Sequence, residues 1–169
     1  MGSTNPESSE STEIRSIIPR DDARIASIIR RVMTDFGAVG EGYSIMDPEV
    51  DGMAAAYAGP GAAYFVASID GEVAGGAGIG PLAGGPPDVC ELKKMYLLPE
   101  ARSRGLGRRL LVVCLEAARN AGYRRCYLET LAHMREARRL YERNGFEPLQ
   151  GPMGDTGHTG CNGWYIREL

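Results

Sequence analysis

The residues with the clearest chemical potential form one basic, glycine-containing segment, PEARSRGLGRRLL, at residues 99–111. Gly105 and Gly107 stand there among four arginines: Arg102, Arg104, Arg108 and Arg109. At a helix start, unpaired backbone N–H groups and the helix dipole attract anions, and glycines let a diphosphate approach the backbone. Guanidinium groups also match phosphate oxygens in charge and geometry. The segment therefore predicts a diphosphate site, with a tight turn before a solvated basic helix as the alternative.

Two better-known phosphate loops are excluded by spacing. The chain contains neither GxxxxGKS nor GxxxxGKT, so it is not a P-loop nucleotidase. Residues 75–80, GGAGIG, do not fit the GxGxxG spacing, and they lead into Pro81 and a loop rather than into a helix. A dinucleotide-binding fold is therefore unsupported.

Hydrophobic periodicity predicts the elements that position the basic segment. Strands are expected where apolar residues alternate or run between turn residues: 14–18, 62–69, 72–80, 89–98, 125–131, 146–149 and 161–169. Helices are expected where apolar residues recur every three or four positions: 21–36, 48–58, 105–121 and 134–143. Asp70 and Gly71 predict a two-residue hairpin turn. The order β-α-α-β-β-β-α-β-α-β-β indicates an α/β fold with a mixed sheet.

Length and composition fit one domain. Of the 169 residues, 43% are hydrophobic and 24% are charged, which excludes a disordered chain, a collagen-like repeat and a coiled coil. Residues 2–13 are small, polar and acidic, so residues 1–13 are expected to form a disordered tail before a single domain at 14–169. A net charge of −3 provides no overall basic field that would recruit nucleic acid or an anionic membrane.

Further patterns favour a cytoplasmic location. The N-terminus lacks the cationic start and apolar run of a secretory signal, and the uncharged stretch 53–69 is interrupted by Gly-Pro-Gly, so no membrane span is expected. Four cysteines without a CxxC pair indicate buried thiols in a reducing compartment: Cys90, Cys114, Cys126 and Cys161. No cluster with the spacing of metal ligands is visible, so no metal is expected.

Two motifs resemble the GCN5-related N-acetyltransferase (GNAT) family. Residues 102–107, RSRGLG, match its Arg/Gln-x-x-Gly-x-Gly/Ala signature, and residues 137–146, ARRLYERNGF, resemble its helix that ends in LYxxxGF. The order of elements from Ile14 to Leu169 also fits. The resemblance implies a mixed, mostly antiparallel central sheet of about seven strands flanked by about four helices. It also implies acetyl transfer from acetyl-CoA, as co-substrate, to a primary amine of a small molecule.

The resemblance implies roles for individual residues. Backbone groups near Leu97 would meet the pantetheine arm and the acetyl carbonyl, and Tyr141 would protonate the departing thiolate, with core packing as its alternative role. The pyrophosphate would be held by the backbone amides of one loop: Arg102, Ser103, Arg104, Gly105, Leu106, Gly107 and Arg108. Met134 departs from the pattern, because members often have an asparagine there that contacts the cofactor. That contact is either missing or supplied by a neighbour.

The acceptor side needs a base, because an alkyl amine titrates near ~10.4 and must lose a proton before it attacks a thioester. Related enzymes often carry an acid on the strand at 89–98, which makes Glu91 the first candidate. Glu129 on the next strand is the second, and His158 in the glycine-rich loop is a third, as base or as acceptor contact. Salt bridges for the two acids and a solvated histidine are the alternatives.

Neighbouring lysines and cysteines bear on the substrate and the mechanism. Lys93 and Lys94 should point to opposite faces of a regular strand, so one of them could pair with the carboxylate of an amino-acid-like acceptor. Cys90 and Cys126 lack a histidine partner evident in the sequence, which favours direct attack in a ternary complex over a covalent acyl-enzyme. A CoA-binding regulatory or interaction module without transferase activity is the alternative function. The exposed final strands are compatible with a homodimer.

Overall fold

One open sheet of seven strands organises residues 9–169, the part of the chain that the computed structural model describes. The sheet order is β1-β2-β3-β4-β5-β7-β6, and every neighbouring pair is antiparallel except β4 and β5. The strands are β1 (Thr12–Ser16), β2 (Ala63–Ile69), β3 (Glu72–Pro81), β4 (Val89–Leu97), β5 (Arg125–Thr130), β6 (Glu147–Pro148) and β7 (Gly163–Glu168). The predicted mixed, mostly antiparallel sheet is confirmed.

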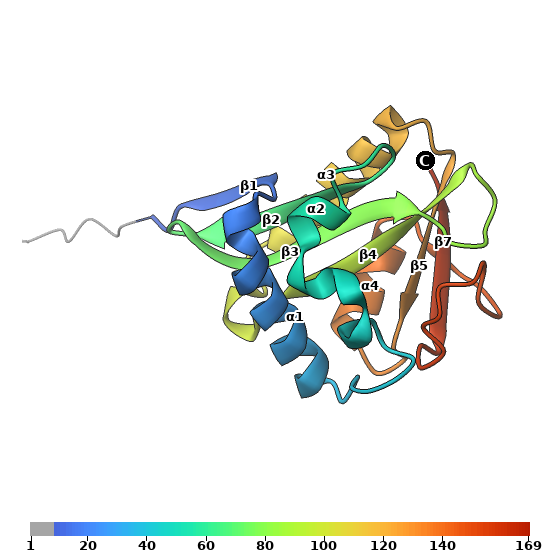
Figure 1. The fold of residues 1–169 in the computed structure, drawn as a ribbon, viewed down its shortest axis with the longest axis horizontal. Coiled ribbons are helices and arrows are strands. Elements are labelled where there is room, and N and C mark those ends of the chain that lie inside the picture. Colours follow the sequence, from blue (N-terminus) through green and yellow to red (C-terminus); the bar gives the residue numbers. More distant parts are fainter. Residues whose placement is uncertain (1–8) are drawn as a thin grey trace, which may run out of the picture.

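Four α-helices cover the two faces of this sheet. They are α1 (Asp22–Asp35), α2 (Met53–Ala56), α3 (Leu106–Asn120) and α4 (Arg135–Arg143). α1 and α2 lie on one face and α3 and α4 on the other (Figure 1). α1 buries residues spaced three and four apart, among them Ile25, Ile29 and Val32. Each such side chain contributes about 1.5–3 kcal/mol when it leaves water, so this apolar stripe holds α1 against β3 and β4.

Several predicted boundaries differ from the observed ones. The helix expected at 48–58 is a 3-10 turn, η3 (Pro48–Asp51), followed by the one-turn α2, and Gly52 separates the two. β1 begins at Thr12 and pairs with β2, so residues 12–13 of the expected tail belong to the sheet. Residues 1–8 of that tail lie outside the described residues. β6 and β7 are shorter than the strands expected at 146–149 and 161–169.

The hairpin turn predicted between β2 and β3 is confirmed. Asp70 and Gly71 both have positive φ, 49° and 83°, as a two-residue hairpin turn that matches the strand twist requires. All four cysteines are free thiols; three of them are buried as expected, whereas Cys161 is only partly buried. Within residues 9–169, no helix combines the length and the apolar composition that crossing a membrane needs.

The sheet divides between β4 and β5. Three residue pairs join the two parallel strands, and the last of them is Glu91 with Tyr127. Beyond that point β4 carries a bulge, where two residues oppose one residue of β3, and Lys94 adopts a left-handed backbone with φ of 49°. Because the bulge bends β4, the two strands separate, and cavities open where their pairing ends.

Candidate active site

A groove of about 860 Å³ runs between the end of β4, the N-terminus of α3 and the length of α4. Seven of the residues predicted for the cofactor site line it: Leu97, Arg102, Ser103, Gly105, Gly107, Arg108 and Tyr141. The fold thus brings residues 102–108 and Tyr141, which are far apart in the chain, to the same groove.

The loop that enters α3 has the backbone of an anion site. Ser103 and Gly105 both have positive φ, 62° and 75°, and Gly105 immediately precedes the helix. Gly107 lies in the first turn, where an added Cβ would come within 3.4 Å of Leu140 and 3.6 Å of Leu97. The absence of a side chain there keeps the backbone N–H groups of the first turn open to the groove, which suits a diphosphate.

The four arginines of this loop divide into two pairs. Arg102 and Arg108 line the groove, and Arg102 donates from Nε to the Leu97 carbonyl at 3.1 Å. Arg104 forms an ion pair with Glu10, and Arg109 donates to the hydroxyl of Thr12 at 2.7 Å, so both turn toward the start of the chain.

Two of the predicted cofactor-binding residues lie apart from the groove. The Leu106 side chain is buried in the core, and the Arg104 side chain is engaged elsewhere, so their backbone N–H groups are what they can offer a ligand. The opposite wall carries cations that sequence reasoning missed: Arg135, Arg139 and Arg143. Their spacing of four residues along α4 is the signal that would have placed them on one face. Together with Arg102 and Arg108 they make the groove basic, as a phosphate-bearing cofactor requires.

A second cavity, of about 60 Å³, adjoins the groove on the side of α1. We call it the acceptor pocket; the two cavities share the residues Phe36, Met95, Tyr96, Met134 and Tyr141. Its remaining walls come from the separated parts of β4 and β5, the loop before β7, and the segment after α1. A ligand in the groove and a ligand in the pocket would therefore meet beside Tyr141.

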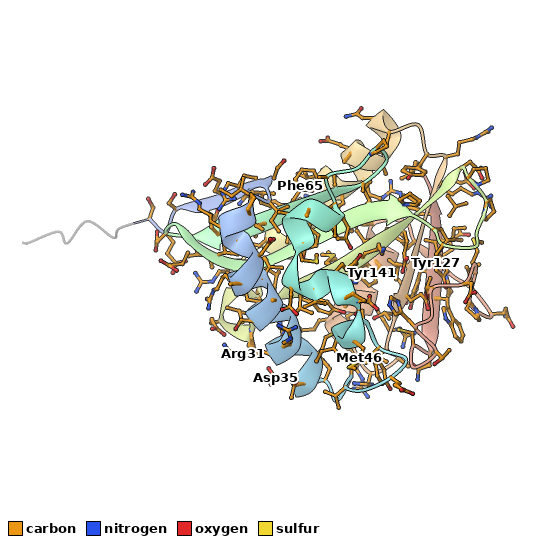
Figure 2. All side chains as sticks on the ribbon, viewed as in Figure 1. Arg31, Asp35, Met46, Phe65, Tyr127 and Tyr141 are labelled. Atoms are coloured by element: carbon orange, nitrogen blue, oxygen red, sulfur yellow. The ribbon has the colours of Figure 1, made fainter. Side chains whose placement is uncertain are left out.

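Tyr141 is 6% exposed and lies well inside the outline of the molecule (Figure 2). Its ring packs against Phe146 and Tyr165, while its hydroxyl makes no hydrogen bond with any described residue. Burial raises the pKa of Tyr141, so the phenol keeps its proton at neutral pH. Met134, the departure from the family pattern, lines both cavities. Its sulfur accepts a hydrogen bond from the Thr130 hydroxyl at 3.8 Å.

The three candidates for the base, which the sequence left as alternatives, converge in the acceptor pocket. One oxygen of Glu91, one oxygen of Glu129 and one ring nitrogen of His158 all lie within 4.8 Å of one another. β4 and β5 bring the two acids side by side, and the loop before β7 folds His158 over them.

The environments of the two acids differ. Glu91 is 4% exposed, and within residues 9–169 no hydrogen bond or ion pair engages its carboxylate. Burial raises the pKa of Glu91 to about 7, with Lys93 opposing this effect and Glu129 adding to it. Glu129 is half-buried and accepts a hydrogen bond from the Thr156 hydroxyl, and burial raises its pKa as well. Glu91 is thus the unengaged carboxylate of the pair.

A charged network that sequence reasoning missed links two residues that line the pocket, Lys94 and His158, to carboxylates that do not line it. The Lys94 side chain is 1% exposed, and its Nζ lies 2.6 Å from Asp47 and 2.7 Å from Glu49. His158 Nε2 joins the same network, 3.0 Å from Asp47 Oδ2. Asp47 directly precedes the helix expected at 48–58, and no local pattern links it to a histidine 111 residues away.

The prediction that Lys93 and Lys94 point to opposite faces of a regular strand is wrong. The bulge at Lys94 breaks the alternation of side chains, and both lysines line the acceptor pocket. Lys94 is held by two carboxylates, whereas Lys93 lies 3.9 Å from Glu49 and over the ring of Tyr57. Of the two, Lys93 is the lysine that can still meet a ligand.

Comparisons with known proteins agree with this architecture. Residues 29–146 match the Acetyltransferase (GNAT) family. The uncharacterized N-acetyltransferase YjgM of Escherichia coli is 44% identical over 161 residues, which cover 95% of this chain and 96% of that protein. A GNAT-family acetyltransferase from Staphylococcus aureus has a TM-score of 0.77 at 19% identity, covering 94% of this chain and 99% of its own. PaiA N-acetyltransferase from Thermoplasma acidophilum, solved in complex with coenzyme A, has a TM-score of 0.73 at 19% identity, with coverages of 94% and 99%.

The chain therefore belongs to the GNAT acetyltransferase family, as its two motifs indicated. It is an N-acetyltransferase, an enzyme of the acyltransferase class.

Proposed function

We propose that this enzyme transfers the acetyl group of acetyl-CoA to a primary amine of a small molecule, by direct attack in a ternary complex. The observation that carries the proposal is the junction of two cavities: a basic groove suited to a diphosphate meets a small pocket that contains Glu91 and Glu129, beside Tyr141. Acetyl-CoA supplies an activated acyl group as a thioester. PaiA N-acetyltransferase, which has a similar fold, was solved in complex with coenzyme A, and this supports a coenzyme A ester as the cofactor here.

The residues of this chain would divide the proton transfers between them. Glu91, buried and unengaged, would take a proton from the acceptor ammonium, and its pKa near 7 suits a base that works at neutral pH. Tyr141 would donate a proton to the departing thiolate, because its hydroxyl is protonated and makes no hydrogen bond within residues 9–169. Glu129 and His158 would line the acceptor amine without being the base, since each is already hydrogen-bonded.

The acceptor pocket favours a small, cationic amine. Two carboxylates, those of Glu91 and Glu129, line it and can pair with an ammonium, while Asp47 and Glu49 offset the charge of Lys94. About 60 Å³ of space admits the end of a small molecule. An amino-acid-like acceptor remains a prediction, with Lys93 as the partner for its carboxylate. A cytoplasmic location and a homodimer also remain predictions.

Cofactor binding tests the groove directly. Calorimetric titration should show selective micromolar binding of acetyl-CoA, with no comparable binding of NADPH or ATP. Arg108→Gln should weaken acetyl-CoA binding about tenfold, because it removes one charge-assisted contact to phosphate. Arg109→Gln is the matched control, since this neighbouring arginine turns away to Thr12 and should leave the affinity unchanged. Absence of acetyl-CoA binding to the wild type would contradict the proposal.

The role of Tyr141 can be separated from cofactor binding. Tyr141→Phe should lower kcat about tenfold to a hundredfold, because the thiolate then leaves without a positioned acid. The acetyl-CoA affinity should change less than threefold, roughly the scale of one weak hydrogen bond. Thiol release over amino acids, polyamines, aminoglycosides and peptide N-termini would identify the acceptor for this assay. Unchanged turnover in the variant would remove the assigned role, and binding without turnover over the whole panel would contradict transferase activity toward small amines.

A further inference from the structure

Asp47 joins two parts of the acceptor pocket that are remote in sequence. It lies between two short 3-10 turns, η2 (Ser44–Met46) and η3. Its Oδ2 accepts from Lys94 Nζ at 2.6 Å, and its two oxygens lie 3.2 and 3.0 Å from His158 Nε2. The Asp47 carboxylate therefore connects the bulge of β4 to the loop before β7.

His158 is fixed from both sides. Its backbone N–H donates to the Thr156 hydroxyl at 3.2 Å, and the same loop is tied to the segment after α1 by the hydrogen bond from Gly160 N to Gly42 O, at 2.9 Å. With Nε2 directed at Asp47, the imidazole has a set orientation in the pocket, within 4.8 Å of a carboxylate oxygen of Glu91. These contacts place a histidine charge beside the proposed base.

The charges that face Glu91 come from every surrounding element. Lys93 and Lys94 belong to β4, Glu129 to β5, and His158 to the loop before β7. Cys161 lines the same pocket, and burial raises the pKa of its thiol to about 12, so it is neutral at pH 7. Hydrogen bonds to Asp47 and Glu49 outweigh burial and raise the pKa of Lys94, whereas an imidazole changes its charge near neutral pH. His158 is therefore the group in this set whose protonation at neutral pH depends on its neighbours.

We propose that Asp47 is a positioning residue that holds His158 against Glu91 as the imidazolium and so keeps Glu91 ionised, ready to accept the acceptor's proton. This inference rests on the proposed role of Glu91 as base. The geometry supplies both links, from Asp47 to His158 and from His158 to Glu91.

The pKa directions agree with this arrangement. The hydrogen bond to Asp47 raises the pKa of His158 above its usual value, against the effect of burial. The charge on His158 in turn lowers the pKa of Glu91, which burial alone would raise further. Loss of the Asp47 charge should thus lower the pKa of His158, remove the imidazolium at neutral pH, and raise the pKa of Glu91.

The test reads both groups directly by NMR in the full-length protein without any acceptor. The imidazole resonances of the two histidines in the chain and the Glu91 side-chain carboxyl carbon would be followed against pH. His158→Gln and Glu91→Gln would assign them. In Asp47→Asn, which keeps a hydrogen-bond acceptor, the pKa of His158 should fall by about one unit and that of Glu91 should rise by about half a unit.

Matched variants separate this role from a structural one. Glu49→Gln removes the other carboxylate on Lys94 but does not touch His158, so the pKa of His158 should stay in place and that of Glu91 should not rise. His158→Gln leaves the Asp47–Lys94 pair intact and should raise the pKa of Glu91 as Asp47→Asn does. The double variant should raise it no further than His158→Gln alone, because Asp47 acts through the imidazole. If Asp47→Asn does not fold, His158→Gln and Glu49→Gln still decide the effect on Glu91.

Each outcome decides the inference. An unchanged His158 titration in Asp47→Asn would overturn the first link, and an unchanged Glu91 titration in His158→Gln would overturn the second. An additive double variant would overturn the claim that Asp47 acts through His158. Failure of the proposed base would appear elsewhere, as wild-type turnover in Glu91→Gln, and these titrations are independent of turnover.

Discussion

Replacing Glu91 with glutamine should lower kcat by roughly a hundredfold to ten-thousandfold, the usual contribution of a positioned general base. The amide has nearly the same shape but cannot take the proton of the acceptor ammonium. Acetyl-CoA affinity should stay close to that of the wild type, because Glu91 lines the acceptor pocket and not the groove. Steady-state thiol release and calorimetry would measure the two quantities on the same preparation.

The role of Glu91 as base also predicts how activity depends on pH. A carboxylate accepts a proton only when it is ionised, so wild-type kcat/KM should fall as the pH drops through the Glu91 pKa of about 7. The acceptor amine titrates far higher, near ~10.4, and adds a separate limb. The acid limb should be absent in Glu91→Gln. Glu129→Gln is the matched control and should cost no more than about tenfold, because Thr156 already engages that acid. Loss of activity confined to Glu129→Gln would transfer the role of base to Glu129.

Replacing Lys94 with methionine should lower the free energy of unfolding by about 3 kcal/mol, within the range for breaking a buried ion pair. The side chain is 1% exposed and lies between Asp47 and Glu49, so its loss leaves two half-buried carboxylates facing each other. For a domain of this length the melting temperature should fall by roughly 6–12 °C. Thermal unfolding followed by circular dichroism would measure it.

Lys93→Met provides the control on the adjacent residue. That side chain is 22% exposed and 3.9 Å from Glu49, so its removal should cost less than about 1 kcal/mol. Equal losses in the two variants would contradict the assigned difference between the lysines.

Acidification gives a second readout of the same ion pair. Burial alone would raise the pKa of Asp47, but hydrogen bonds from His158 and Lys94 outweigh it and hold that pKa below its usual range. The pKa of Glu49 is also lowered, because the hydrogen bond from Lys94 and the charge of Lys94 outweigh burial. Carboxyl groups of this kind stabilise the fold above their unfolded pKa values, near ~4, and lose that contribution as the pH falls further. The stability difference between wild type and Lys94→Met should therefore narrow below about pH 4.

The elements that carry strong periodicity or turn chemistry were predictable from the sequence. α1, α3, the hairpin at Asp70 and the basic loop before α3 all depend on neighbouring residues, and the structure confirms them. One helix was expected at 48–58, but the structure has two short turns there, separated by Gly52. The first of these turns carries Glu49 and directly follows Asp47. Tertiary demands outweighed weak local propensity there.

The candidate site was predictable in its parts but not in its assembly. Glu91, Glu129 and His158 could each be named, yet their convergence depends on strand pairing and on a loop that returns from the far end of the chain. The bulge at Lys94 was invisible because the alternation of a regular strand was the only local guide. Asp47 has no signal near it in sequence, since its partners lie 47 and 111 residues away.

The parting of β4 from β5 also bears on how the enzyme avoids unwanted association. A strand edge with unpaired N–H and C=O groups usually invites other chains to add to it. Here the separated segments of β4 and β5 are two such edges, but they face each other inside the molecule, below the groove and the pocket. The groove and the pocket at these edges leave room for a slender ligand with amide groups. The fold thus keeps the hydrogen-bonding capacity of an open sheet edge for small molecules, without the risk of aggregation that an exposed edge would bring.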